Sequence, residues 1–487
     1  MAKIKSKLNG NGNNHGIGNV VHSIRNIMRK DPGVDGDAQR ISQMTWMIFL
    51  KVFDAMEEEK EAEEGYKSPL SEEIRWRNWA SDEEGITGDE LLDFVNDKVF
   101  NGIKNLEVKN SKKAQIVKQV FEDTYNYMKS GVLMRQVINE INKIDFTSSE
   151  DRHLFNDIYE TILRELQSAG SAGEFYTPRA VTQFLVDMVN PKLGEIVLDP
   201  ACGTGGFLIS SLENMRKKVD NVEELQRLGK DLKGIEKKPL PHLLCMTNLM
   251  LHDIEEPNIK HDNSLSKPLR EYSSKDMIEV VVTNPPFGGA EEEGIENNFP
   301  SEFKTRETAD LFLVLIMKLL RDEGRCGIVL PDGFLFGEGV KTRIKERLLA
   351  EFNLHTIVRL PNGVFNPYTG IRTNLLFFEK GKPTKEIWYF EHPLPEGYKT
   401  YNKGKPIQIK EFDLEKEWWK DRNNKKFENH CWKVSLDEIQ KRKYNLDINN
   451  PNGKSEEENL SSKEILEKLE KNLEKSKELI AKIRKEV

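Results

Sequence analysis

Six short apolar runs between residues 195 and 381 constrain the fold of this 487-residue chain more than any other feature. Each run is rich in Val, Ile, Leu or Phe and usually leads into glycine or proline, as in 195–207 and 279–287. Stretches long enough for helices, such as 310–324, lie between the runs. Because strands alternate with helices, this part predicts an α/β fold with a doubly wound mixed sheet.

The remainder of the chain differs from this part in its pattern. Residues 1–17 predict a flexible basic lead, and apolar residues at three- and four-residue spacing predict a helical domain over 18–167. The sheet domain is expected over 168–390, followed by a mixed extension over 391–455. The segment 456–487 predicts a coiled-coil-like helix, with a seam formed by Leu466, Leu469, Leu473, Ile480, Ile483 and Val487 and interrupted at Ser476. That helix either packs on its own protein or, as a narrow seam favours, pairs with a partner helix.

Composition excludes several classes of protein. No window approaches the roughly 18 continuous apolar residues of a membrane-spanning helix, and the start lacks the apolar stretch of a secretory signal. The four cysteines are widely spaced, so we expect a cytoplasmic protein with reduced thiols and no metal. The formal net charge is −8, so binding of nucleic acid would need a partner or a local basic cleft, because phosphates are neutralised by Lys and Arg.

A glycine-rich loop follows the first run, in the sequence "DPACGTGG" that begins at Asp199. Gly203, Gly205 and Gly206 permit tight turns and close approach of a ligand. The spacing is not G-x-G-x-x-G, and no Lys-Ser/Thr pair follows as in a phosphate-binding P-loop. The loop therefore suits a nucleoside with a small zwitterionic group better than a triphosphate.

Two acidic residues follow the next two predicted strands. Glu236 stands where nucleotide-binding sheets carry an acid that accepts hydrogen bonds from ribose hydroxyls. Asp262 follows a third strand and could accept from the exocyclic amino group of adenine. Taken alone, each is more often a solvated surface acid or a helix-cap residue. Their order after Asp199 favours the ligand-binding interpretation.

The stretch Asn284-Pro285-Pro286-Phe287 directly follows an apolar strand. Its prolines fix φ and remove two N–H donors, so the loop is stiff. The side-chain oxygen of Asn284 and the carbonyl of Pro285 can accept both hydrogens of an exocyclic NH₂ group. That nitrogen is then oriented to attack a methyl carbon in line with a sulfonium leaving group, and such orientation is worth roughly 7–11 kcal/mol. Phe287 would stack on the base, which must flip out of a duplex to reach the loop.

These motifs resemble the N6-adenine DNA methyltransferases of the gamma arrangement, which use S-adenosyl-L-methionine. The order is the same: "GEFYTPR" at 173–179, then the glycine-rich loop, then N-P-P-F. The helical N-terminal region, "LPDGFLFG" (330–337), "GIRTNLLFFEKG" (370–381) and "YNLDINNP" (444–451) resemble the modification subunit of Type I restriction–modification systems. The resemblance implies a Rossmann-like methyltransferase domain and a site-specific, adenine-specific DNA methyltransferase.

The resemblance also implies roles for individual residues and partners. The target adenine would be held by the catalytic residues Asn284, Pro285, Pro286 and Phe287. The cofactor would be bound by Glu174, Phe175, Tyr176 and Thr177 at its methionine part, by Asp199, Gly203, Thr204 and Gly205 in its pocket, by Glu236 at the ribose and by Asp262 at the adenine. The implied partners are double-stranded DNA, a second modification subunit, a specificity subunit that recognises the target, and a restriction subunit, without a membrane.

Two other interpretations compete with this one. Loops of the form N-P-P-aromatic also present glutamine amides in methyltransferases that act on release factors, although the long N-terminal helical region argues against that acceptor. The chain could also be a cofactor-bound scaffold without turnover. The intact N-P-P-F sequence argues against a scaffold, which does not need it.

Overall fold

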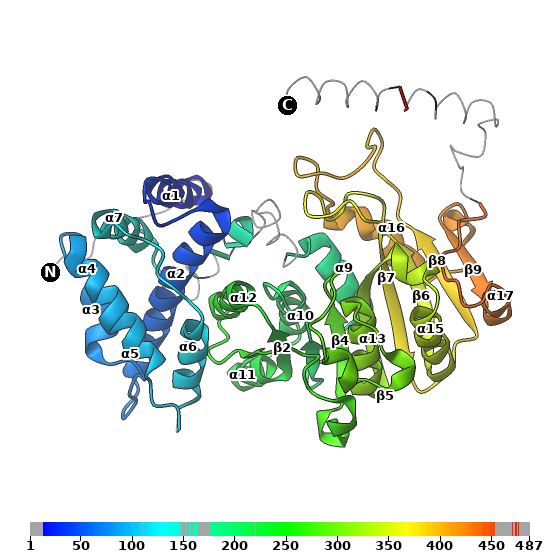
Figure 1. Ribbon diagram of the computed structural model, residues 1–487, viewed down its shortest axis with the longest axis horizontal. Helices are drawn as coiled ribbons and strands as arrows, with labels where there is room; N and C mark the ends of the chain where they lie inside the picture. Colours follow the sequence, from blue (N-terminus) through cyan, green and yellow to red (C-terminus); the bar gives the residue numbers. More distant parts are fainter. Residues whose placement is uncertain are drawn as a thin grey trace.

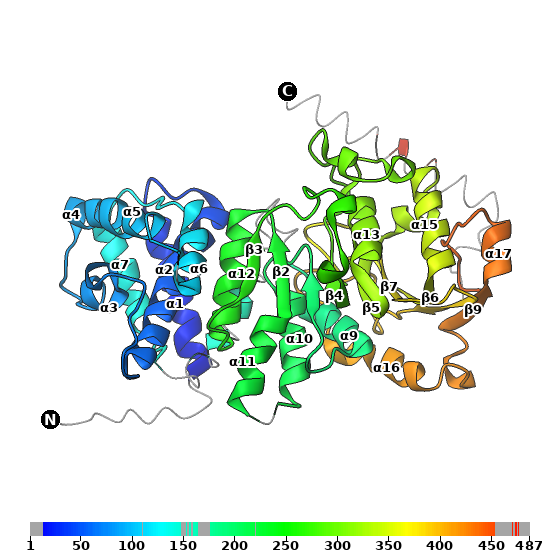
Figure 2. The ribbon, with the colours of Figure 1, turned by 90° about the horizontal axis from the view of Figure 1, so that it is seen from below.

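The computed structural model describes residues 13–109, 111–147, 176–219 and 221–452, with a few positions between 152 and 163 and between 470 and 476. Figures 1 and 2 show an N-terminal helical body beside a larger body built on a sheet. The two bodies meet where α2 contacts α12. The predicted seam over 456–487 lies almost entirely outside the described residues.

The N-terminal body is held together by the long, largely buried helix α2 (Gly36–Glu61). Trp46 on α2 is fully buried and packs edge-to-face on Phe100, with ring centroids 5.1 Å apart, and on Phe121, at 6.4 Å. Such aromatic pairs stabilise a core beyond the area that they bury. The other helices of this body are α1 (Asn13–Met28), α3 (Trp76–Trp79), α4 (Gly88–Asp93), a π-helical segment (Phe94–Phe100), α5 (Asn101–Lys104), α6 (Lys112–Glu122) and α7 (Gly131–Asn142).

The described strands form one nine-stranded sheet in the order β3-β2-β1-β4-β5-β7-β6-β8-β9. From β3 to β5 neighbouring strands are parallel, whereas β7 runs antiparallel to both β5 and β6. The strands are β1 (Val197–Asp199), β2 (Leu232–Glu236), β3 (Asn258–His261), β4 (Ile278–Thr283), β5 (Leu320–Pro331), β6 (Phe352–Arg359), β7 (Thr373–Lys380), β8 (Glu386–Glu391) and β9 (Cys431–Ser435). The predicted α/β fold with a mixed sheet is confirmed.

Helices cover both faces of the sheet, as a doubly wound fold requires. Along β4, Val280 and Val282 belong to one buried cluster and Val281 to the other, because successive strand side chains point to opposite faces. The first cluster includes residues of α9 (Arg179–Val189), α10 (Gly206–Arg216) and α12 (Pro239–Leu251), and the second includes residues of α13 (Thr308–Leu319) and α15 (Val340–Glu351). The remaining helices are α11 (Val222–Asp231), α14 (Asp332–Phe336), α16 (Asp413–Lys420) and α17 (Leu436–Lys441).

The segment 391–455 continues the same sheet. It supplies β9, which pairs antiparallel with β8, and Trp432 of β9 stacks on Tyr389 of β8 at a centroid distance of 5.2 Å. The domain boundaries proposed from the sequence stay a prediction. Among the described residues, no helix has both the length and the apolar character needed to cross a bilayer.

Candidate active site

The carboxyl ends of β1, β2 and β4 meet at one edge of the sheet, because these strands are parallel neighbours. The loops that follow them line a cavity of about 400 Å³. Eight residues singled out from the sequence line this cavity: Thr177, Asp199, Gly203, Thr204, Gly206, Glu236, Asn284 and Pro286. Ligands of doubly wound sheets bind at this edge, so the cavity is the candidate active site.

The glycine-rich loop between β1 and α10 requires two of its glycines for its conformation. Gly203 and Gly205 have φ values of 51° and 82°, in the left-handed region that disfavours other residues. A Cβ atom on Gly205 would lie 2.8 Å from the sulfur of Cys245 on α12. Gly205 itself does not line the cavity, so it acts by letting the loop pack closely on α12.

Asp199 ends β1 with a carboxylate that is completely buried. Its Oδ1 accepts hydrogen bonds from the Thr283 hydroxyl at 2.6 Å and the Ala201 N–H at 3.1 Å. Its Oδ2 has no hydrogen-bond partner among the described residues. Burial, together with the nearby charge of Glu236, raises the pKa of Asp199 to about 7, although its two hydrogen bonds lower it. A buried acceptor without a donor beside a cavity fits a ligand that brings an N–H or O–H group.

Glu236 ends β2, and its carboxylate holds the glycine-rich loop in place. Oε2 accepts the N–H of Gly203 at 2.9 Å, and Oε1 accepts the N–H of Lys238 at 2.7 Å. These backbone bonds fix the orientation of the carboxylate. The predicted ribose acceptor is therefore oriented at the wall of the cavity.

Asp262 directly follows β3 but does not line the cavity. It is exposed, and its Oδ1 accepts the N–H of Asn263 at 2.8 Å. Lys237, just after β2, does line the cavity, and its ammonium group lies 3.2 Å from Glu291 and 2.8 Å from Glu292. Sequence reasoning missed this cluster, because Glu291 lies more than fifty residues from Lys237 along the chain.

Asn284 lies just beyond β4 and is linked to the upstream motif. Its Nδ2 donates to the hydroxyl of Thr177 at 2.9 Å, and its buried Oδ1 has no partner among the described residues. The amide therefore carries an unpaired acceptor oxygen, and its predicted role in binding a target amine stays a prediction. Of the neighbouring prolines, Pro286 lines the cavity and Pro285 is buried beside it.

Phe287 is half-buried and packs edge-to-face on Phe365, with ring centroids 5.9 Å apart and an interplanar angle of 81°. Phe365 was not singled out from the sequence. It comes from the loop after β6, and only the folded sheet brings that loop next to the one after β4. The signal for it in the sequence is limited to a strand-like run that ends in "LPNGVF".

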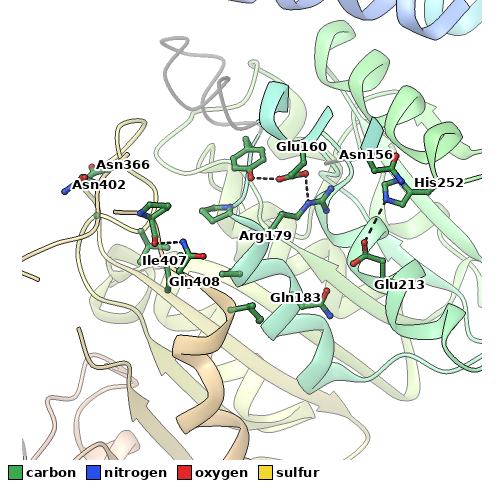
Figure 3. Close-up of a pocket in the computed structure, with 17 residues that line it drawn as sticks. Asn156, Glu160, Arg179, Gln183, Glu213, His252, Asn366, Asn402, Ile407 and Gln408 are labelled. Atoms are coloured by element: carbon green, nitrogen blue, oxygen red, sulfur yellow. Dashed lines mark hydrogen bonds and ion pairs between the residues drawn. The ribbon is translucent and has the colours of Figure 1, made fainter. Parts of the chain in front are cut away.

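The segment 176–179 separates this cavity from a second one of about 430 Å³, which Figure 3 shows. Tyr176 lines the second cavity, and its hydroxyl donates to Glu160 at 2.5 Å. Arg179 pairs with the same carboxylate at 2.7 Å and donates to the carbonyl of Gly206 at 2.9 Å. Tyr176 thus faces away from the candidate active site, whereas Thr177 faces it. Glu174 and Phe175, also predicted to bind the cofactor, lie outside the described residues.

Comparisons with known proteins agree with this geometry. Residues 150–460 match the family described as N-6 DNA Methylase, and residues 17–141 match the HsdM N-terminal domain. A relative from Escherichia coli, named the Type I restriction enzyme EcoEI methylase subunit, is 58% identical over 444 residues, which cover 89% of this chain and 90% of the relative.

Two solved structures are similar over almost their whole length. One belongs to a study of complex assembly and conformational transition of the type I R-M system; it is 38% identical, has a TM-score of 0.82, and the match covers 96% of this chain and 97% of that one. The other is a modification subunit assigned to a type I restriction enzyme of Vibrio vulnificus YJ016, with 44% identity, a TM-score of 0.80, and coverage of 90% of this chain and 97% of that one.

Proposed function

Because this chain belongs to the Type I methylase subunits of the N-6 DNA methylase family, we propose that it methylates N6 of a flipped-out adenine with S-adenosyl-L-methionine, at sites chosen by a specificity subunit. The observation that carries the proposal is a pair of buried acceptor atoms without a partner among the described residues, Asn284 Oδ1 and Asp199 Oδ2, on two residues that line the same cavity. Asn284 Oδ1 suits the N–H groups of the amine that receives the methyl group, and Asp199 Oδ2 suits an N–H or O–H group of a bound cofactor.

The cavity residues fit S-adenosyl-L-methionine. Asp199 has a carboxylate oxygen without a partner among the described residues, Glu236 adds a second carboxylate to the lining, and the glycine-rich loop admits close approach of a ligand. Thr177 and Thr204 add hydroxyl groups to the lining. When bound, the cofactor supplies an electrophilic methyl group on a sulfonium centre. No group of three or more potential metal ligands occurs in the part of the chain that the structure describes.

The chain's own contribution to methyl transfer is orientation. Asn284 Oδ1 and the Pro285 carbonyl would accept the two N–H bonds of the adenine amino group and direct the nitrogen lone pair at the methyl carbon. The nitrogen becomes acidic as it is alkylated, so its extra proton passes to solvent without a strong base. The hydrogen bond that the amide nitrogen of Asn284 donates to the Thr177 hydroxyl leaves the amide oxygen available for this role.

A base enters such a site only after it leaves the duplex, at a cost of a few kcal/mol. Phe287 would offset part of that cost by stacking on the base, and Phe365 holds the Phe287 ring from the side. This arrangement supports a flipped adenine as the acceptor.

We also propose that the chain acts in the cytoplasm within a complex of two modification subunits and one specificity subunit, which a restriction subunit joins. The net charge of −8 supports a partner that contributes to DNA binding. The relative studied for complex assembly of the type I R-M system supports a role within a multisubunit complex.

The test is expression in a host that lacks adenine methylation, with and without a candidate specificity subunit. Long-read sequencing then maps modified bases. We expect N6-methyladenine at one sequence motif, and only when both subunits are present. Methylation without the partner would contradict its role in recognition, and no methylation in either case, with cofactor binding intact, would contradict the proposed reaction.

A further inference from the structure

A basic hairpin, residues 397–410, differs in charge from the acidic chain that carries it. It contains four lysines and no acid between Glu396 and Glu411, namely Lys399, Lys403, Lys405 and Lys410. All four lysines are exposed, and none forms an ion pair with another described residue. The hairpin is therefore a surface of concentrated, uncompensated positive charge.

The tip of the basic hairpin has a fixed backbone. The Oδ1 of Asn402 accepts the N–H groups of Gly404 at 2.9 Å and Lys405 at 3.1 Å, and Asn402 and Lys405 exchange two backbone hydrogen bonds. The ammonium group of Lys405 lies 4.6 Å from the centre of the Tyr398 ring. Because this turn is already ordered, less conformational entropy is lost when a ligand binds to it.

A buried polar network attaches the basic hairpin to the sheet. His392, just after β8, lies 2.6 Å from a carboxylate oxygen of Glu415 on α16 and 3.2 Å from the hydroxyl of Tyr401 in the hairpin. Tyr401 in turn donates to Glu411. His392, Tyr401 and Glu415 are almost completely buried, so the hairpin is fixed to the protein body at its centre.

The basic hairpin also contacts the loop that supports the proposed target site. The N–H of Tyr401 donates to the carbonyl of Asn362 at 3.3 Å, and the amide of Asn366 donates to the carbonyl of Tyr401 at 3.1 Å. Figure 3 shows Asn366 and Asn402 side by side at one end of the second cavity. Phe365, in the same loop as Asn366, packs on Phe287. One supporting loop therefore connects the lysines to the residue proposed to stack on the adenine.

We propose that the basic hairpin binds backbone phosphates of the DNA duplex beside the flipped adenine. This inference rests on the proposed function and assigns a role to a part of 391–455 that the sequence left open. The positive charge of the hairpin complements the phosphates, and its contact with the loop that carries Phe365 brings it to the side of the site where the strand with the flipped base would run. Phosphate contacts fix position and orientation without reading sequence, so the hairpin would serve any target chosen by the partner subunit.

The experiment compares two triple variants in the assembled complex of this chain with its specificity subunit. The test variant is Lys399→Gln, Lys403→Gln and Lys405→Gln. The control variant removes the same charge from exposed lysines without ion pairs, Lys382→Gln, Lys420→Gln and Lys425→Gln. Lys382 follows β7, which is antiparallel to β5, so it lies at the opposite edge of the sheet from the active site. The probe is one duplex of fixed sequence, which includes the motif mapped by sequencing when methylation is observed, titrated at 50 and 200 mM salt.

The expected result follows from counter-ion release. Each phosphate contact makes binding roughly 3.5-fold weaker over this change in salt, so loss of three contacts reduces the salt sensitivity of the dissociation constant by about 40-fold. The test variant should bind DNA more weakly at 50 mM salt, and its dissociation constant should change less between the two salt concentrations by this factor. The control variant should match the wild type. S-adenosyl-L-methionine affinity should be the same in all three proteins.

Two results would overturn the proposal. One is equal DNA affinity and salt dependence for the test and control variants. The other is failure of the test variant to assemble with the specificity subunit in native mass spectrometry, which would make the hairpin a protein interface. Wild-type complex in the same assay separates these results from failure of the proposed function, because a wild type that binds DNA without methylating adenine contradicts only the proposed reaction.

Discussion

The loop after β1 and the loop after β4 line the same cavity but achieve their conformations in different ways. The β1 loop relies on left-handed glycines and on carboxylates that accept its own N–H groups, as Glu236 accepts from Gly203. The β4 loop relies on two prolines and on one side-chain bond from Asn284 to Thr177. The β1 loop therefore forms a cofactor-binding surface through its backbone conformation, whereas the β4 loop presents a single amide oxygen. Changes in the two loops should affect binding and chemistry separately.

The largest expected effect comes from the β4 loop. Asn284→Ala removes the acceptor for the target amine, and we expect kcat to fall roughly 10²–10³-fold, the order seen when one positioned hydrogen-bonding group is lost from an active site. Single-turnover methylation of the mapped duplex measures it. Asn284→Asp is the matched control, because it keeps an acceptor oxygen in the same place and should retain more activity. Equal losses in both variants would contradict the acceptor role.

A substitution in the β1 loop tests the other half of the comparison. Gly205→Ala forces a side chain into the left-handed region and places its Cβ 2.8 Å from the Cys245 sulfur. We expect a loss of about 2–4 kcal/mol in unfolding free energy, from backbone strain and overpacking together. Thermal denaturation and cofactor titration measure the stability and the cofactor affinity.

Gly339→Ala is the control for the glycine substitution, since Gly339 also has a positive φ, 69°, but nothing lies within 4 Å of its added Cβ. Its unfolding free energy should fall only by the part that comes from backbone strain. If both variants are equally destabilised, close packing on α12 does not explain the glycine at 205.

The buried carboxylate of Asp199 predicts a pH dependence of stability. Because its pKa is raised to about 7, the folded state holds a proton that the unfolded state releases near pH 4, and stability falls as pH rises towards 7 and then levels off. Between pH 6 and pH 8 the cofactor-free protein should lose about 1.4 kcal/mol from this group. Asp199→Asn should remove that loss while its amide oxygen still accepts from Thr283. Melting curves of both proteins at the two pH values test this, and parallel pH profiles would contradict it.

The smallest effect is expected where the β4 loop meets the loop after β6. Phe365→Leu keeps an apolar side chain in a buried site but removes the ring beside Phe287. An aromatic pair contributes about 0.5–1.5 kcal/mol beyond its buried area, so kcat/KM for DNA should fall roughly 2- to 10-fold. Cofactor affinity should not change. A change in cofactor affinity without a change in kcat/KM would contradict this role, because Phe365 would then support cofactor binding and not the β4 loop.

The sequence predicted the parts of the site that are local to one strand end. Asp199, Glu236 and Asn284 each stand at a strand terminus, and parallel strands bring such termini to one edge. The sequence did not predict contacts across the sheet. The pair of Lys237 with Glu291 and the packing of Phe365 on Phe287 join residues 54 and 78 positions apart, and no periodicity signals them.

The same limit explains why individual orientations differ from expectation. Tyr176 and Thr177 are adjacent, yet one lines the second cavity and the other the candidate active site. The sequence located the motif along the chain but did not show which of the two cavities each of its residues lines. Asp262 also differs from expectation. It directly follows a strand, but its carboxylate accepts the N–H of the next residue, Asn263.

The most direct test of separate roles for the two loops is the dissociation constant of S-adenosyl-L-methionine, measured by calorimetry for Asn284→Ala. We expect this variant to bind the cofactor within about twofold of the wild type while its transfer rate falls as stated above. Loss of cofactor binding in step with the rate would contradict the account, because the β4 loop would then belong to the cofactor receptor.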